Sequence, residues 1–333
     1  MRPSAVLALE NPVVVSLITS HARASDLPSL CLATKSLSAA ATRRLYYSLV
    51  LTNPSSALLA CETVANTPRV AAHVRGLVLG RGAPPVWRAL QRALEFVPHL
   101  EALALDARGM QLSWVFPRTP SFHLRDLRLG IPWDAQVAAF VRTQPSLRAL
   151  WVLEIAENYS PCVNSEPQSR TSTGATGTGG ETQVVAEIDD APTEMNTMDL
   201  PLLATVECPL RIAHAFVCSP LTHLQVLGEA TEAAAASAIG RSPSDDARLR
   251  QLILRLARAR ATLRSLSLHD VPEARTADTI ALVARHCPQL RYLGILSLPS
   301  GPVRTPFSGS LLPSPPPRPP SACWLKLFFN NFY

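Results

Sequence analysis

Apolar residues recur along this chain in a six-position pattern, in which positions one, four and six are apolar and the others vary. The last two apolar positions of each copy alternate with a variable residue, so each copy predicts a short strand with one buried face. The chain has seven regular copies and one weaker match at Leu203/Val206/Cys208. The seven regular copies are Val74/Leu77/Leu79, Leu100/Leu103/Leu105, Leu124/Leu127/Leu129, Leu147/Leu150/Val152, Leu221/Leu224/Val226, Leu263/Leu266/Leu268 and Leu290/Leu293/Ile295.

The segments between these copies carry apolar residues at helical spacing. Val86, Leu90 and Leu94 would share one helix face, and comparable spacing predicts helices within 134–143 and 245–259, and over 277–286. Asp134 stands where a helix favours a capping side chain. The repeating unit is therefore a strand, a turn and a helix.

Three similar hexamers mark the return from helix to strand: PHLEAL at Pro98, PSLRAL at Pro145 and PQLRYL at Pro288. Proline has no amide hydrogen and cannot continue a helical hydrogen-bond ladder. We therefore expect each of these prolines to end a helix just before the next strand.

The middle apolar positions of the first four copies are 23 to 26 residues apart, and those of the last two copies are 27 apart. Leucine-rich repeats have periods of about 20–29 residues. A lone strand or helix cannot bury its apolar face, whereas stacked units form a continuous core. The pattern predicts an α/β solenoid of about seven irregular leucine-rich repeats with short parallel strands. The alternative is a chance alignment of leucine-rich helices.

Composition divides the chain into five regions. Residues 1–72 are apolar and helix-like, and repeats occupy 73–157 and 200–298. The stretch 158–199 is rich in Ser, Thr, Gly, Pro and acidic residues, so it predicts a disordered insertion. A Pro-rich disordered tail is expected over 299–333.

The charge and cysteine content narrow the possible partners. The net charge is +6, and 29 of the 31 basic residues are arginines, but these are scattered beside leucines rather than massed on one face. We therefore expect no nucleic-acid partner. No apolar run reaches the roughly 20 residues of a membrane span, so no membrane partner is expected either. Seven irregularly spaced cysteines fit a reducing compartment, which favours a cytoplasmic or nuclear location.

Catalytic and metal-binding motifs are missing from the sequence. The eight histidines show no metal-ligand spacing, and there is no CxxC, P-loop or GxSxG motif. We therefore expect no cofactor, no metal and no enzymatic activity.

The stretch from Asp26 to Leu51 resembles the F-box of fungal F-box proteins. The first part of that pattern is matched by Leu27, Leu30, Leu32, Lys35, Ser36 and Leu37, and the second part by Arg44, Leu45, Tyr46 and Leu49. Where the family opens with Leu-Pro and an acidic residue, this chain has Asn11-Pro12-Val13-Val14. The resemblance implies a three-helix module that docks the Skp-type adaptor of a cullin–RING ligase. The implied adaptor-binding residues are Pro12, Leu27, Pro28, Leu30, Leu37, Leu45 and Tyr46.

The residues of this segment also allow a reading without the family. Leu27, Leu30, Leu37, Leu45 and Leu49 would form a small three-helix core, which is poorly self-sufficient and would gain from a partner. Alternatively, the module simply caps the open end of the solenoid.

The variable positions that flank the buried strand residues would face an open, concave surface. Trp151 stands out there, because interface hot spots are enriched in Trp, Tyr and Arg. Alternatively, the insertion folds over Trp151 or the strand register breaks there. The predicted partner-binding residues are Asp126, Arg128, Trp151, His223, Gln225, His269 and Tyr292.

These observations predict a substrate-receptor subunit of an SCF-type ubiquitin ligase, as the resemblance implies. Its F-box would dock the adaptor and its repeats would bind a protein target whose identity the sequence does not encode. We expect a monomer outside the complex. The alternative is a non-catalytic leucine-rich-repeat scaffold that binds no adaptor.

Overall fold

The computed structural model describes residues 11–23, 25–80, 82–155, 197–228, 243–258 and 262–298. The predicted insertion and tail lie outside these residues, except for 197–199. In that short stretch Met198 is 2% exposed and its amide donates to the Ala215 carbonyl. Residues 197–199 therefore belong to the packed structure and not to the predicted insertion.

Three helices form the N-terminal module: α2 (Pro12–His21), α3 (Leu27–Cys31) and α4 (Lys35–Tyr47). Asn11 caps α2 by accepting a hydrogen bond from the Val13 amide, and Thr34 caps α4 through the Leu37 amide. The helices pack on one another through a few buried side chains, which are Val15, Leu27, Leu37 and Ala41.

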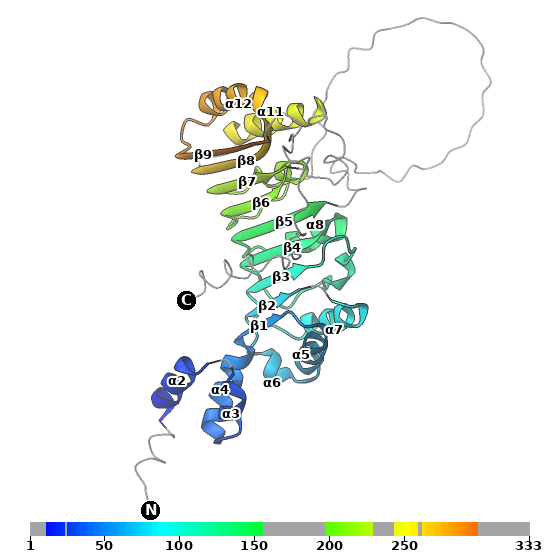
Figure 1. Ribbon diagram of the computed structural model, residues 1–333, viewed down its shortest axis with the longest axis vertical. Helices are drawn as coiled ribbons and strands as arrows, with labels where there is room; N and C mark the ends of the chain where they lie inside the picture. Colours follow the sequence, from blue (N-terminus) through cyan, green and yellow to red (C-terminus); the bar gives the residue numbers. More distant parts are fainter. Residues whose placement is uncertain are drawn as a thin grey trace, which may run out of the picture. The chain divides into compact units, whose positions relative to one another are not determined.

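A single parallel sheet follows, with nine strands in chain order (Figure 1). The strands are β1 (Ser48–Leu51), β2 (Gly76–Leu79), β3 (Ala102–Asp106), β4 (Asp126–Trp133), β5 (Ala149–Ile155), β6 (Thr205–Pro209), β7 (His223–Leu227), β8 (Ser265–Pro272) and β9 (Tyr292–Leu298).

The register of this sheet aligns the apolar pattern from strand to strand. The middle apolar residue of each strand lies opposite that of the next, as Leu127 does opposite Leu103 and Leu150. The apolar residue two positions further along each strand forms a second row in the same way, as Leu129 does opposite Leu105 and Val152. From β2 to β8, both rows are at most 4% exposed. All eight apolar copies, including the weak one at Leu203, therefore mark real strands.

The first strand was not predicted, and the helical module ends earlier than residue 72. Residues 1–72 include β1, α5 (Pro54–Asn66) and α6 (Pro68–Ala71), and β1 pairs with β2. Leu49 lies in β1 and not in a three-helix core. Tyr46 stands where the other copies carry an aliphatic residue, and this aromatic substitution concealed the copy Tyr46/Leu49/Leu51.

Helices accompany the strands and complete the core. Figure 1 shows α5, α7 (Pro84–Glu95) and α8 (Ala135–Arg142) along one side of the sheet. Their apolar faces join the leucine rows in one buried cluster. The remaining helices are η1 (Ser113–Val115), α9 (Leu210–Ala213), η2 (His214–Phe216), α11 (Pro243–Arg258) and α12 (Glu273–His286). The structure thus confirms the predicted helices and a solenoid-like α/β arrangement.

The hexamer prolines lie in turns immediately after helices, as predicted. Pro98 follows α7 within a turn closed by a hydrogen bond from the Leu100 amide to the Val97 carbonyl. The amides of Leu147 and Leu290 close equivalent turns. Proline suits the second position of such a turn because its ring fixes φ near the required value. Each proline therefore both ends a helix and begins the turn into the next strand.

Two strands, β4 and β8, contain register shifts, between Leu129 and Pro132 and between His269 and Val271. Within the shift in β8, Asp270 adopts φ 60°, in the left-handed region that Asp and Asn tolerate better than most residues. Its carboxylate occupies the space where any Cβ at Gly228 would lie, so this close approach requires glycine there.

Candidate functional site

The side chains that alternate with the leucine rows form the other face of the sheet, which we call the open face. The seven predicted partner-binding residues all lie on it. Asp126, His223 and Tyr292 belong to one row across the strands, and Arg128, Trp151 and Gln225 belong to the next. His269 lies on β8, two residues beyond Ser267, which is the β8 member of that second row. The strand register thus puts all seven on this face, and their binding role stays a prediction.

Arg128 and Trp151 contact each other on the open face. They are opposite each other on β4 and β5, and the guanidinium carbon of Arg128 lies 4.1 Å from the centre of the Trp151 ring. A cation at this distance over an aromatic face is attracted by the ring quadrupole. The contact leaves Trp151 half-buried and restricts the orientation of its ring.

Glu207 lies next to this pair, and sequence reasoning missed it. It is opposite Trp151 on β6, so Arg128, Trp151 and Glu207 are consecutive in one row. The signal was present but weak, because β6 carries the poorest copy of the apolar pattern and its outward residues were not assigned. We call Asp126, Arg128, Trp151, Glu207 and His269 the open-face cluster.

Burial dominates the electrostatics of this cluster. It raises the pKa of Asp126, an effect partly offset by Arg128, Arg125 and Arg148. Burial also raises the pKa of Glu207, and His269 and Arg128 oppose that rise. Burial lowers the pKa of Arg128, and the Asp126 and Glu207 carboxylates oppose that decrease. The cluster is therefore a group of partly desolvated charges and not a set of freely solvated surface residues.

The other predicted residues lie around or beyond the cluster. Gln225 is opposite Glu207 and extends its row to β7. His223 is exposed, and its Nδ1 lies 2.8 Å from the Thr222 hydroxyl. Tyr292 is 61% exposed on β9, five strands from Asp126, which corresponds to about 24 Å across a sheet. Tyr292 therefore cannot contact a small ligand bound beside Asp126.

The residues implied to bind an adaptor fall into two groups in the N-terminal module. Pro12 and Pro28 are exposed, and Leu30, Leu45 and Tyr46 are half-buried. Leu27 and Leu37 are only 4% and 5% exposed, so they hold the module together and offer no contact surface. Apolar spacing alone could not reveal which leucines turn inward.

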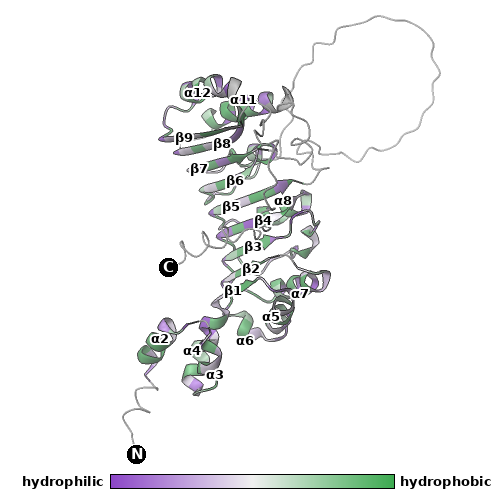
Figure 2. Cartoon of the chain, in the orientation of Figure 1, coloured by the Kyte–Doolittle hydropathy of each residue, from purple (hydrophilic) through white to green (hydrophobic). Residues whose placement is uncertain are grey.

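A different set of apolar side chains is exposed on this module. Val13 and Leu17 are one turn apart on α2 and are 72% and 59% exposed, with Ile18 beside them at 36%. Leu32 follows α3 and is 89% exposed. The hydropathy colouring of α2 shows this apolar character (Figure 2). Neighbouring exposed apolar side chains such as Val13 and Leu17 are typical of a surface that meets a partner.

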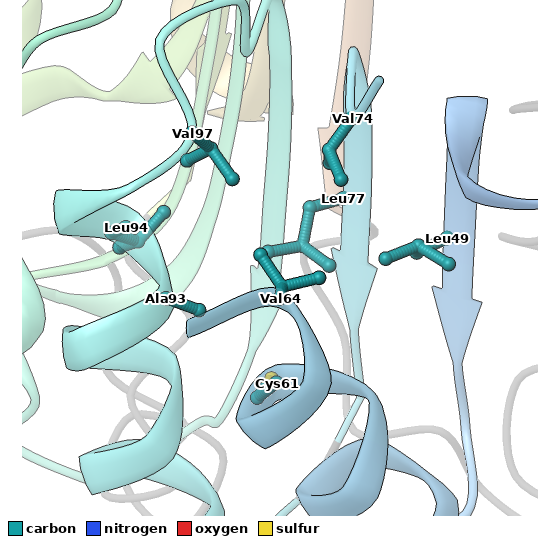
Figure 3. A pocket seen from close by; sticks show the side chains of 8 residues that line it. All are labelled: Leu49, Cys61, Val64, Val74, Leu77, Ala93, Leu94 and Val97. Carbon is teal, nitrogen blue, oxygen red and sulfur yellow. The ribbon is translucent and has the colours of Figure 1, made fainter. Parts of the chain in front are cut away.

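The structure also contains two hollows. One, of about 10 Å³, lies among β1, β2, α5 and α7 and is lined only by apolar side chains (Figure 3). Because it has room for about one water and offers that water no polar partner, it is a packing gap. The other, of about 190 Å³, lies between α11 and α12, where Arg275 pairs with Asp246 at 3.3 Å.

Within the described residues, no group of three or more His, Cys, Asp or Glu side chains converges on a point that could hold a metal ion. The described helices include none that is both long enough and apolar enough to cross a bilayer. Burial raises the pKa of the Cys61 thiol to about 11, with Glu62 contributing, so this thiol is a poor nucleophile at neutral pH.

No protein-family model and no curated protein sequence matches this chain. Its class therefore follows from the fold, which is a solenoid-like α/β protein with one parallel sheet. One face of that sheet is packed with helices, and the other presents a compact cluster of charged and aromatic side chains.

Proposed function

We propose that this protein is the substrate-receptor subunit of an SCF-type cullin–RING ubiquitin ligase. In this proposal the N-terminal module is an F-box that docks the Skp-type adaptor, and the strands and helices that follow are leucine-rich repeats that bind a protein target on the open face. The chain would carry out no chemistry. It would raise the effective concentration of the target beside the ligase.

The observation that carries this proposal is the exposed apolar surface of the module. Val13, Leu17 and Leu32 expose more than half of their side-chain area. Apolar burial stabilises an association by roughly 25 cal/mol per Å² removed from water, so these side chains favour a partner over solvent. The resemblance of Asp26 to Leu51 to the F-box pattern indicates which partner this is.

A test compares adaptor binding by the full chain and two variants. Double substitution Val13→Asp and Leu17→Asp should weaken binding to a purified Skp-type adaptor at least tenfold, because two apolar contacts are replaced by charges that must be desolvated. The control is Leu59→Asp on α5, where the side chain is similarly exposed at 65%. Calorimetric titration of each protein with the adaptor gives the comparison.

The alternative is a non-catalytic repeat scaffold that binds no adaptor. One observation favours it: Tyr46 of α4 packs against the sheet core, as a residue of a terminal cap would. An unaltered chain that fails to bind the adaptor would overturn the receptor proposal and leave this one.

A further inference from the structure

The residues that immediately precede the strands form a continuous row along one rim of the sheet. Each occupies the second position of its copy of the apolar pattern. Its backbone amide donates a hydrogen bond of 2.7–2.9 Å to the carbonyl of the same position in the preceding copy. Neighbours in the row are therefore about 4.8 Å apart, as adjacent strands are. We call this the rim row, and its members are Tyr47, Arg75, Glu101, Arg125, Arg148, Ala204, Thr222, Arg264 and Arg291.

The rim row gathers much of the positive charge of the chain. Its nine members include five arginines and one glutamate, whereas the net charge of the whole chain is +6. These arginines are far apart in the sequence, and the strand register brings them together. Like charges on adjacent strands repel each other, so such a row needs acidic side chains or an anionic partner beside it.

The N-terminal half of the rim row has acidic side chains of its own. Glu101 pairs with Arg75 at 3.5 Å and with Arg125 at 3.2 Å. Asp126, the first residue of β4, interacts electrostatically with Arg125 and Arg148. Two acids therefore accompany the three arginines of this half.

The C-terminal half of the rim row differs in this respect. Arg264 and Arg291 are adjacent and exposed. Neither forms an ion pair or a side-chain hydrogen bond with a residue that the structure describes. Tyr292 follows Arg291 and is 61% exposed, and its hydroxyl can donate a hydrogen bond to an anion. This end of the rim therefore presents two neighbouring guanidinium groups and a hydroxyl donor to solvent.

A short acidic protein segment fits this end of the rim better than a nucleic acid does. The planar guanidinium of arginine binds a carboxylate through two parallel hydrogen bonds, so adjacent arginines can each receive one carboxylate. A nucleic acid binds through a longer series of phosphates. Along the rim that series would approach Asp126 and Glu101, about 19 and 24 Å from Arg264, where two carboxylates would repel it.

We propose that Arg264 and Arg291 bind a short, carboxylate-rich segment of the target protein. This inference rests on the proposed function, because it assigns a chemical class to the target of that receptor. The carboxylates of the segment would pair with the two guanidinium groups, and the Tyr292 hydroxyl would donate a further hydrogen bond. The target would thereby supply the negative charge that the N-terminal half of the row obtains from Glu101 and Asp126.

The test uses the full chain and a rhodamine-labelled peptide of alternating glutamate and glycine. A length of about six residues spans about 20 Å when extended, so the peptide covers the site without reaching the whole rim. A glutamine–glycine peptide with the same label is the comparison. Fluorescence anisotropy should show saturable binding of the glutamate peptide, weakened by added salt, and no binding of the glutamine peptide. In the double variant Arg264→Gln, Arg291→Gln, affinity should fall about tenfold, because two charge-assisted pairs are lost.

The matched control is the double variant Arg88→Gln, Arg142→Gln, which removes two exposed arginines from α7 and α8 and changes the net charge equally. Its affinity for the glutamate peptide should be nearly unchanged. An equal loss in this control would show attraction by net charge alone and would overturn the proposal. Equal binding of the glutamine peptide, no binding of the glutamate peptide, or tighter binding of a thymidine oligonucleotide of the same charge would also overturn it.

Adaptor binding by the Arg264→Gln, Arg291→Gln variant is measured in parallel and should be intact. A chain that binds the glutamate peptide but no adaptor would contradict the receptor proposal and leave the acidic-segment site standing. A chain that binds the adaptor but not the peptide would contradict only the present inference. The two failures are therefore distinguishable.

Discussion

The two faces of the sheet are built from alternate residues of the same strands, yet one face carries apolar and the other polar or aromatic side chains. On the covered face, leucine or a similar residue fills both rows from β2 to β8 with at most 4% exposure. On the open face, neighbouring positions in one row hold Arg128, Trp151, Glu207 and Gln225. Close packing against helices restricts the covered face to apolar side chains that fit. The open face is not restricted in this way, so charged and aromatic side chains can occupy it.

The contrast separates stability from function within single strands. Leu150 is fully buried, whereas its neighbour Trp151 stacks with a cation at the surface. A residue of the covered face should affect mainly folding, and a residue of the open face should affect mainly binding. Three experiments test how strictly this division holds.

The largest effect is expected from two tryptophans on opposite faces. Trp133 is fully buried, with its ring 5.9 Å from that of Phe216. Its replacement by alanine should lower the free energy of unfolding by about 3–5 kcal/mol, because a large cavity forms. Trp151→Ala should cost about 1 kcal/mol, since a partly exposed ring and one cation–π contact are lost. Urea denaturation measures both, and equal losses would show that Trp151 is a core residue.

A second test concerns His214, a buried residue beside α11. Burial, reinforced by the charge of Arg255, lowers its pKa from the ordinary 6.5 to about 4. The unfolded chain therefore binds a proton that the folded chain rejects, and stability should fall by up to about 3 kcal/mol as the pH drops from about 6.5 to 4.

Denaturation of the unaltered chain and of His214→Asn across this range gives the measurement. The variant lacks the titrating ring, so its stability should depend less on pH in that window even if it is less stable at neutral pH. Identical pH dependence in both proteins would contradict the assignment.

The smallest effect is expected on the open face. Burial raises the pKa values of Asp126 and Glu207, so their ionised forms are disfavoured in the folded chain at pH 7. Asp126→Asn and Glu207→Gln should therefore raise the free energy of unfolding, by up to about 0.5 kcal/mol. The gain should disappear in acid, where both carboxylates are protonated in either state. Destabilisation at pH 7 instead would show that these charges support the fold.

Much of the fold could be predicted because its signal is local. The alternation within Leu103/Leu105 or Leu127/Leu129 marks a strand wherever it occurs, and helical spacing marks the segments between. The prolines of the hexamers act on their own backbone, so their role could also be inferred without the structure. The strand at Ser48–Leu51 was missed because an aromatic residue interrupted the same local signal.

The site depended on neighbours that are distant in the chain. Residue types and alternation by themselves placed Asp126, Arg128 and Trp151 on one face, because every second residue of a strand points the same way. Only the tertiary structure placed Glu207 beside Trp151, 56 positions further along the chain, and only it turned Leu27 inward while leaving Val13 and Leu17 exposed. Such pairings depend on strand register and helix packing, which arise when separate segments bury their apolar faces together.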